Sequence, residues 1–203
     1  MSQRIHDHFK VNDPLLFQYI VRIPLVPLEL PQNLFQNLCR SIVGQQLSVK
    51  AAATIFGRLI AHFPNGEITP EQLLSLPDEK IRSCGVSGAK TKSLKDLSTK
   101  VIEGKLAIEK LHELEDEQVI ETLCNVRGIG RWTAEMFLIF SLGRENIFSH
   151  GDAGLRRAIQ ILYKFKTPPT QTQIEKIIKR WSPYKSFASR ILWRSLDTEP
   201  FKI

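Results

Sequence analysis

The segment LCNVRGIGRWTAEMFLIFSLGRENIFSHGD, residues 123–152, decides the fold of this chain. Within it, the pentapeptide Val126-Arg127-Gly128-Ile129-Gly130 separates two stretches of helical periodicity. Glycine is expected at positions 128 and 130 because the backbone must there adopt conformations, and approach a ligand, in ways that a Cβ would block. The segment therefore predicts two helices joined by a tight glycine hairpin.

Helical periodicity continues through the rest of the chain, and no stretch alternates as a half-buried strand would. Ser48 is expected to cap a helix because an apolar pattern with helical spacing follows it. Thr69 and Thr170 are expected to cap helices because each begins a capping box that ends at the glutamine three residues later. Val49 is assigned to the apolar face of the helix after Ser48, and Asp116 is expected to cap the helix before the hairpin. The sequence therefore predicts an all-α fold with about ten helices.

Composition limits the classes of protein to consider. The 203 residues carry a formal net charge of +7 with a pI near 9.4, which favours a polyanionic partner. No apolar run approaches the roughly 20 residues that cross a bilayer, and the start MSQRIHDHFK lacks the apolar core of a signal peptide. We therefore expect an intracellular protein with no membrane partner. Cys39, Cys84 and Cys124 have no paired spacing, so neither a disulfide framework nor a zinc or iron–sulfur site is predicted.

The hairpin is a candidate phosphate site. The N–H groups at the start of the helix after Gly130 can face an anion, and Arg127 and Arg131 add positive charge on either side. One DNA phosphate held in this way would be bound without any base being read. An apolar residue between two glycines, helices on both sides and a basic surround together indicate nucleic-acid binding rather than a plain link between helices.

Five segments that follow one another along the chain carry a further signal. They are Ile42–Ser48, Gly85–Ser87 with Lys90 and Lys92, Val126–Thr133, Asp152–Arg157, and Trp181–Ser186 continuing to Trp193. In these segments the chain resembles the helix-hairpin-helix DNA glycosylases of base excision repair, in the branch of 3-methyladenine DNA glycosylase II and yeast alkyladenine glycosylase. We expect one domain with two lobes, a central lobe of about residues 34–138 that contains the hairpin and a terminal lobe of about residues 1–33 plus 139–203.

Asp152 matches the family's catalytic aspartate, and its chemistry agrees with that role. Cleavage of an N-glycosidic bond builds positive charge on the sugar, which a fixed carboxylate beside C1′ stabilises. Asp152 is expected to be the N-cap of a helix over residues 153–162, whose first N–H groups would keep the carboxylate ionised. His150 and Gly151 stand where relatives often have a proline or an acidic residue, which leaves the arrangement of water and protons open.

Trp132 and Trp193 are the candidate walls of a base pocket. A base has to leave the duplex before its glycosidic bond can be attacked. Aromatic stacking and cation–π attraction would favour a purine made cationic by alkylation. Met136 occupies a position where relatives can carry tyrosine, so a less polar pocket is expected. The resemblance places at Gln46 the residue that fills the gap left by the flipped nucleotide.

Basic side chains on several segments are expected to contact phosphates. They are Lys185, Lys50, Lys90, Lys92 and Arg190. The resemblance also implies a structural Na⁺ or K⁺ ion held by the backbone carbonyls of Cys124, Val126 and Ile129, with no cofactor needed for catalysis.

Two absences limit the chemistry that the resemblance implies. Bifunctional relatives have a lysine nucleophile just after the hairpin, where this chain has Trp132, so no lyase activity is expected. Relatives with a four-cysteine iron–sulfur cluster carry it near the C-terminus, and no cysteine follows Cys124.

The sequence therefore predicts a monomeric, monofunctional glycosylase that hydrolyses alkylated purines, chiefly 3-methyladenine and 7-methylguanine, from duplex DNA and leaves an abasic site. It would work in the cytoplasm at the nucleoid if bacterial, and in the nucleus if eukaryotic. Two alternatives stay open. One is a glycosylase for deaminated or oxidised bases, and the other is a noncatalytic helix-hairpin-helix module that binds DNA or senses lesions.

Overall fold

Residues 3–25 and 27–197 are described by the computed structural model, and they form twelve α-helices and three 3₁₀ helices without any strand. The predicted all-α class is confirmed. The structure has twelve α-helices where about ten were predicted, and α5 (Pro70–Ser75) and α6 (Asp78–Ser83) are the shortest of them, with six residues each. None of the helices in this part of the chain is long and apolar enough to cross a membrane.

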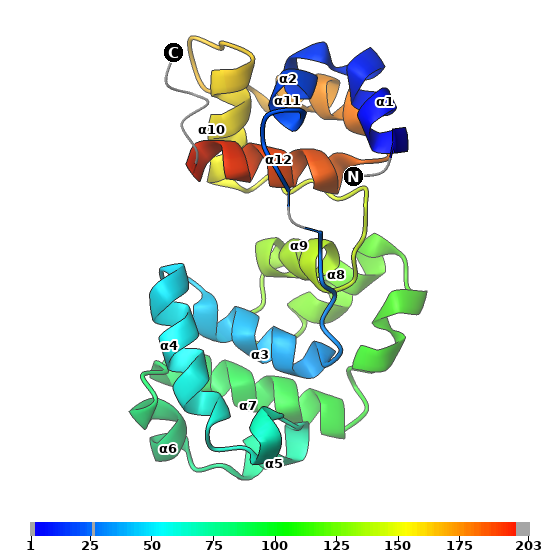
Figure 1. The fold of residues 1–203 in the computed structure, drawn as a ribbon. Coiled ribbons are helices and arrows are strands. Elements are labelled where there is room, and N and C mark those ends of the chain that lie inside the picture. Colours follow the sequence, from blue (N-terminus) through cyan, green and yellow to red (C-terminus); the bar gives the residue numbers. More distant parts are fainter. Residues whose placement is uncertain (1–2, 26, 198–203) are drawn as a thin grey trace. The chain divides into compact units, whose positions relative to one another are not determined.

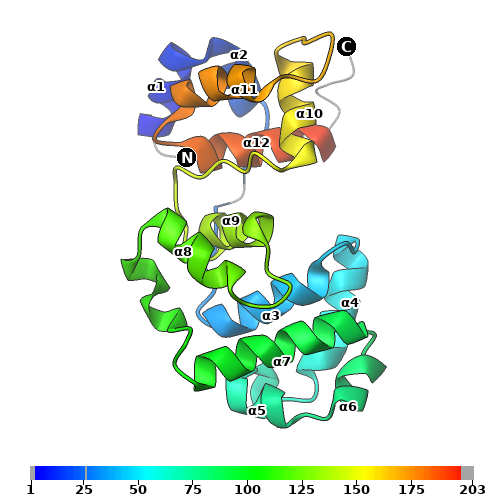
Figure 2. The same ribbon diagram turned by 180° about the vertical axis from the view of Figure 1, so that it is seen from behind.

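The chain divides into two compact units, a terminal unit of residues 1–29 with 143–203 and a central unit of residues 30–142. Besides α5 and α6, the central unit contains α3 (Leu34–Gly44), α4 (Val49–Ile60), η1 (Pro64–Gly66), α7 (Gly88–Ile102), η2 (Ile108–Glu113), α8 (Asp116–Cys124) and α9 (Arg131–Phe140). Its longest helix, α7, packs against α3, α5 and α6 (Figure 2). Leu94 and Leu97 of α7 are fully buried, so this helix lies at the centre of the unit's core.

The terminal unit joins helices from both ends of the described chain. It contains α1 (Gln3–Asn12), α2 (Pro14–Ile20), α10 (Ala153–Leu162), α11 (Gln171–Ile178), η3 (Lys179–Trp181) and α12 (Lys185–Asp197). In Figure 1 the blue N-terminal helices lie beside the orange and red C-terminal ones. The buried carboxylate of Asp13 accepts hydrogen bonds from Trp181 Nε1 at 2.9 Å and from the Tyr163 hydroxyl at 2.5 Å. Buried polar contacts therefore hold α1 and α2 in the same core as the helices that follow residue 152.

Most helix starts lie where the sequence places them. Ser48, Thr69 and Thr170 each accept a hydrogen bond from a backbone N–H of the first helical turn, so these three caps are confirmed. The prediction for Asp116 was wrong, because the N-cap of α8 is Glu115, which forms a capping box with Gln118. Val49 was also assigned wrongly. It is 88% exposed, because the apolar face of α4 begins only in the next turn.

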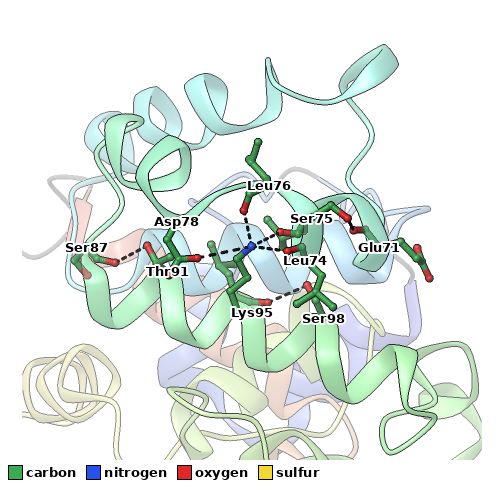
Figure 3. A network of polar contacts seen from close by, with 11 residues as sticks. Glu71, Leu74, Ser75, Leu76, Asp78, Ser87, Thr91, Lys95 and Ser98 are labelled. Atoms are coloured by element: carbon green, nitrogen blue, oxygen red, sulfur yellow. Dashed lines mark hydrogen bonds and ion pairs between the residues drawn. The ribbon is translucent and has the colours of Figure 1, made fainter.

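Lys95 on α7 lies where α5 ends and the chain turns toward α6 (Figure 3). Its ammonium group donates to three carbonyl oxygens, at 3.0 Å from that of Leu73, 2.7 Å from that of Leu74 and 2.5 Å from that of Leu76. Asp78 Oδ1 lies 3.8 Å from the same nitrogen. The last carbonyls of a helix lack intrahelical donors, so Lys95 acts as a side-chain cap for α5 and joins it to the central helix.

Replacing Lys95 with methionine should lower the free energy of unfolding by about 1–3 kcal/mol, because partly buried carbonyls would lose their donor. Urea denaturation measures the change. Lys92→Met is the matched control, since Lys92 lies on the same helix but is exposed. Equal stability of the two variants would mean that water satisfies the carbonyls as well as the ammonium does.

Candidate functional site

The predicted hairpin lies between α8 and α9 in the central unit. The turn is closed by two backbone hydrogen bonds, from the N–H of Val126 to the carbonyl of Leu123 and from the N–H of Ile129 to the carbonyl of Val126, both 3.0 Å long. Val126 and Ile129 are buried, whereas Arg127, Gly128 and Gly130 are exposed. The apolar side chains therefore anchor the hairpin in the core and leave its glycine backbone at the surface.

The two glycines of the hairpin have different reasons to be there. Gly128 has a φ of +77°, and a Cβ on it would clash with the hydroxyl of Ser93 on α7. Gly130 has a φ of −98°, which any residue adopts, and a Cβ there would meet no neighbouring atom. The predicted conformational need for glycine at 130 was therefore wrong. Of the two reasons given for glycine at position 130, only the close approach of a ligand remains, and the space in front of Gly130 is open.

Both arginines of the hairpin donate hydrogen bonds to carboxylates, Arg127 through its backbone N–H and Arg131 through its guanidinium group. The backbone N–H of Arg127 donates to Asp96 Oδ2 at 2.8 Å. The guanidinium of Arg131 donates to both oxygens of Glu117, at 2.6 and 2.9 Å, and to Glu135 Oε1 at 3.0 Å. The hydrogen bond from Arg131 lowers the pKa of the Glu117 carboxyl. The positive charge expected of Arg131 is therefore balanced by carboxylates, and a phosphate would have to compete with Glu117 for it.

The loop after α3 contains Gln46, the residue expected to enter the duplex. Gln46 is exposed and has a φ of +57°. The sequence predicts a phosphate contact for Lys90, but its ammonium group donates instead to the carbonyls of Val43 at 2.9 Å and Gln45 at 2.7 Å. Burial lowers the pKa of this amine. Lys90 is thus a support for the loop, whereas Lys50 and Lys92 are exposed.

An apolar stripe lies at the surface of α9. Trp132 is 47% exposed, Met136 is half-buried and Phe140 is 37% exposed. These residues are four apart, so they share one face of the helix. Trp132 is therefore not a core residue of the central unit.

Asp152 caps α10 in the terminal unit, as the sequence predicts. Its Oδ1 atom accepts a hydrogen bond from the N–H of Leu155 at 2.8 Å and a second one from Trp193 Nε1 at 3.0 Å. The residue is only 8% exposed. These two N–H donors hold the carboxylate oxygen in a fixed position at the start of the helix. The indole of Trp193, from α12, therefore contacts Asp152 directly, which the prediction of a pocket wall did not include.

Gly154 is a residue of this site that sequence reasoning missed. A Cβ at position 154 would lie 3.1 Å from Asp152 Oδ1 and 3.5 Å from Trp193 Cδ1. Glycine thus leaves room for the indole to reach the carboxylate. The doublet Ala153-Gly154 at the start of a helix was the available signal, because glycine there costs helix stability and needs a packing reason.

His150 precedes Asp152 and lies against the body of the terminal unit. Its Nε2 atom is 3.2 Å from Glu175 Oε1 of α11, and its ring makes an edge contact with Phe148. Lys185 begins α12 and is half-buried. Its expected phosphate contact stays a prediction.

The carbonyls expected to hold a monovalent ion belong to the hairpin. Cys124 is the last residue of α8, so its carbonyl is among those that a helix leaves without an internal donor. Hard cations prefer oxygen ligands, so backbone carbonyls are the chemical type of ligand that a Na⁺ or K⁺ ion would need. Among residues 3–25 and 27–197, no cluster of three or more His, Cys, Asp or Glu side chains could hold a metal ion.

Comparison with known proteins places this geometry in a family. A family model described as "HhH-GPD superfamily base excision DNA repair protein" matches residues 39–183. DNA-3-methyladenine glycosylase 1 of Schizosaccharomyces pombe is 35% identical over 163 residues, which are 79% of this chain and 72% of that protein.

Solved structures agree with the sequence relatives. A DNA-3-methyladenine glycosidase from Bacillus halodurans has a TM-score of 0.85 and 38% identity, with 97% of this chain and 90% of that chain covered. The Schizosaccharomyces pombe 3-methyladenine DNA glycosylase in complex with abasic DNA has a TM-score of 0.84 and 30% identity, with 97% and 98% covered.

Proposed function

The chain belongs to the HhH-GPD superfamily of base excision DNA repair proteins, and we propose that it is a monofunctional DNA glycosylase. It hydrolyses the N-glycosidic bond of alkylated purines, chiefly 3-methyladenine and 7-methylguanine, in duplex DNA and leaves an abasic site. The observation that carries the proposal is the buried carboxylate of Asp152, which two N–H donors hold at the start of a helix. The names of the relatives, 3-methyladenine DNA glycosylases, support the choice of substrate.

Asp152 supplies the charge that this reaction needs. As the bond between C1′ and the purine breaks, the sugar becomes positively charged and oxocarbenium-like. A carboxylate that is already fixed in place stabilises this charge without reorganising. The hydrogen bonds from Leu155 and Trp193 hold one oxygen in place, so the negative charge stays where the sugar would bind.

The exposed face of α9 supplies the contact with the base. Trp132 offers a ring on which an electron-poor purine can stack, and Met136 adds a polarisable, apolar neighbour. An alkylated purine is cationic and therefore gains more from such a surface than a neutral base does. The expected selectivity is for cationic lesions.

The hairpin supplies the contact with the DNA backbone. Gly130 is the N-cap of α9 and offers no side-chain cap, so a phosphate can bind the first N–H groups of that helix. The exposed side chain of Arg127 adds positive charge to the hairpin. Lys185, in the terminal unit, is proposed to make a phosphate contact of its own. A Na⁺ or K⁺ ion on the carbonyls of Cys124, Val126 and Ile129 would add a further attraction for the phosphate. We expect the protein to act as a monomer, at the nucleoid or in the nucleus.

The test is an excision assay on duplex DNA that carries methylated purines. The purified protein should release 3-methyladenine and 7-methylguanine faster than hypoxanthine. The product strand should stay intact until alkali cleaves it, since no lysine follows the hairpin to form a Schiff base. A covalent adduct trapped by borohydride would contradict the monofunctional chemistry. Release of deaminated or oxidised bases alone would support the first alternative substrate class, and lesion binding without release of any base would support a noncatalytic module.

A further inference from the structure

A strained turn holds Gln46 at the surface of the central unit. Its φ of +57° lies in the left-handed region, which side chains other than glycine, asparagine and aspartate seldom adopt. The turn is closed by a hydrogen bond of 3.2 Å from the N–H of Leu47 to the carbonyl of Gly44. A residue in such a conformation persists only where its surroundings fix it. The contacts around Gln46 therefore determine the position of its side chain.

The neighbouring side chain, Gln45, reaches from this turn to the hairpin. Its Nε2 atom donates to the carbonyl of Gly128 at 2.9 Å and to the hydroxyl of Thr133 at 3.2 Å. Gly128 is in the hairpin itself, and Thr133 is a buried residue in the first turn of α9. One amide group thus connects the turn that carries Gln46 with both sides of the candidate phosphate site.

Helix α7 makes hydrogen bonds to both the turn that carries Gln46 and the hairpin. Near its start, Lys90 binds the carbonyls of Val43 and Gln45. Farther along, Asp96 accepts a hydrogen bond from the N–H of Arg127. The turn and the hairpin are therefore each tied to α7, and Gln45 joins them directly to each other.

We propose that Gln45 is a positioning residue that couples the phosphate-binding hairpin to the insertion of Gln46 into the duplex. This inference rests on the proposed glycosylase function and concerns the same site. The amide of Gln45 fixes the distance between the bound phosphate and the wedge residue. When the hairpin binds the DNA backbone, Gln46 then stands opposite the nucleotide to be displaced.

The variant Gln45→Met tests this coupling, because methionine has nearly the same shape and lacks the amide. Affinity for undamaged duplex DNA, which depends on phosphate contacts, should stay within about twofold of wild type. Base displacement, which is followed by the fluorescence of 2-aminopurine beside an abasic site, should fall about 3- to 10-fold. The single-turnover rate of 3-methyladenine excision should fall by the same factor, as expected for the loss of neutral hydrogen bonds.

Gln36→Met is the matched control. Gln36 is also a half-buried glutamine of the central unit, and its Oε1 accepts a hydrogen bond from the N–H of Ile68 at 2.9 Å. Gln36→Met should lower the thermal midpoint about as much as Gln45→Met does, without changing base displacement. Equal losses of displacement in both glutamine variants would overturn the proposal, because they would reflect stability alone.

A double variant separates positioning from a direct role. If Gln45 acts through Gln46, then Gln45→Met combined with Gln46→Ala should be no slower than Gln46→Ala alone. Additive losses, or a wild-type displacement signal in Gln45→Met, would overturn the proposal. If Gln45→Met does not fold, Thr133→Val removes the longer of the two contacts and should give a smaller loss in the same direction.

The fluorescence measurement does not require catalysis. A wild-type protein that excises no methylated purine would overturn the proposed function, and the displacement signal would still decide the role of Gln45. Conversely, excision by wild type with no effect of Gln45→Met would leave the proposed function intact and reject the coupling.

Discussion

Asp152→Asn is expected to lower the single-turnover rate of 3-methyladenine excision by about 100- to 1000-fold, the usual cost of removing one fixed electrostatic contact to a charged transition state. Asparagine has the same shape, caps helices as well as aspartate does, and can still accept from Leu155 and Trp193 at Oδ1. The change therefore removes the negative charge and little else.

Two further measurements on the same variant isolate the charge. Its affinity for DNA with an abasic site should stay close to that of wild type, because the hairpin contacts lie on other residues. Its thermal midpoint should also change little. Excision by Asp152→Asn at nearly the wild-type rate would remove Asp152 from the mechanism, whatever the affinity.

Most helix caps, whose signals are local in sequence, were predicted correctly. Ser48, Thr170 and Asp152 cap their helices because the accepting oxygen and the donating N–H are three residues apart. The error at Asp116 came from two adjacent acidic residues that can both serve as caps. The spacing of Glu115 and Gln118, which fits a capping box, could have decided between them.

Contacts between distant segments left no such signal. Lys90 resembles any surface lysine in the sequence, yet its partners are backbone carbonyls 45 and 47 residues away. Every residue has a backbone carbonyl group, so this contact cannot be predicted from the residue types. The same holds for Gln45, whose nearer acceptor is the carbonyl of Gly128. Side-chain support of the backbone is therefore the part of the site that only the fold reveals.

Trp193 illustrates how a correct choice of residue can leave its role open. An aromatic residue on a late helix suggests a wall for the base, and stacking needs only the ring. The structure adds a hydrogen bond of 3.0 Å from the indole to Asp152, a contact that spans 41 residues. Since both roles use the same side chain, only variants that separate the ring from its N–H group can distinguish them.

Trp193→Phe is expected to slow excision of every substrate about 10- to 100-fold, because a hydrogen bond to a charged group contributes about 1.5–3 kcal/mol. Phenylalanine keeps a ring for stacking but cannot donate to Asp152. The loss should appear in the single-turnover rate at saturating enzyme and leave the concentration for half-saturation nearly unchanged. It should be equal for 3-methyladenine, 7-methylguanine and hypoxanthine.

Trp193→Ala removes the ring as well and should weaken lesion recognition by a further 1–3 kcal/mol, about the contribution of one base–aromatic stack. Trp132→Ala should weaken lesion recognition by a similar amount, because its exposed ring is the stacking surface proposed on α9. In the Asp152→Asn background the charge is gone, so adding Trp193→Phe should change the rate far less than it does in wild type. Circular dichroism must show that each variant is folded. If Trp193→Phe excises at the wild-type rate while Trp193→Ala is slow, the indole is a stacking surface and its hydrogen bond to Asp152 has no part in catalysis.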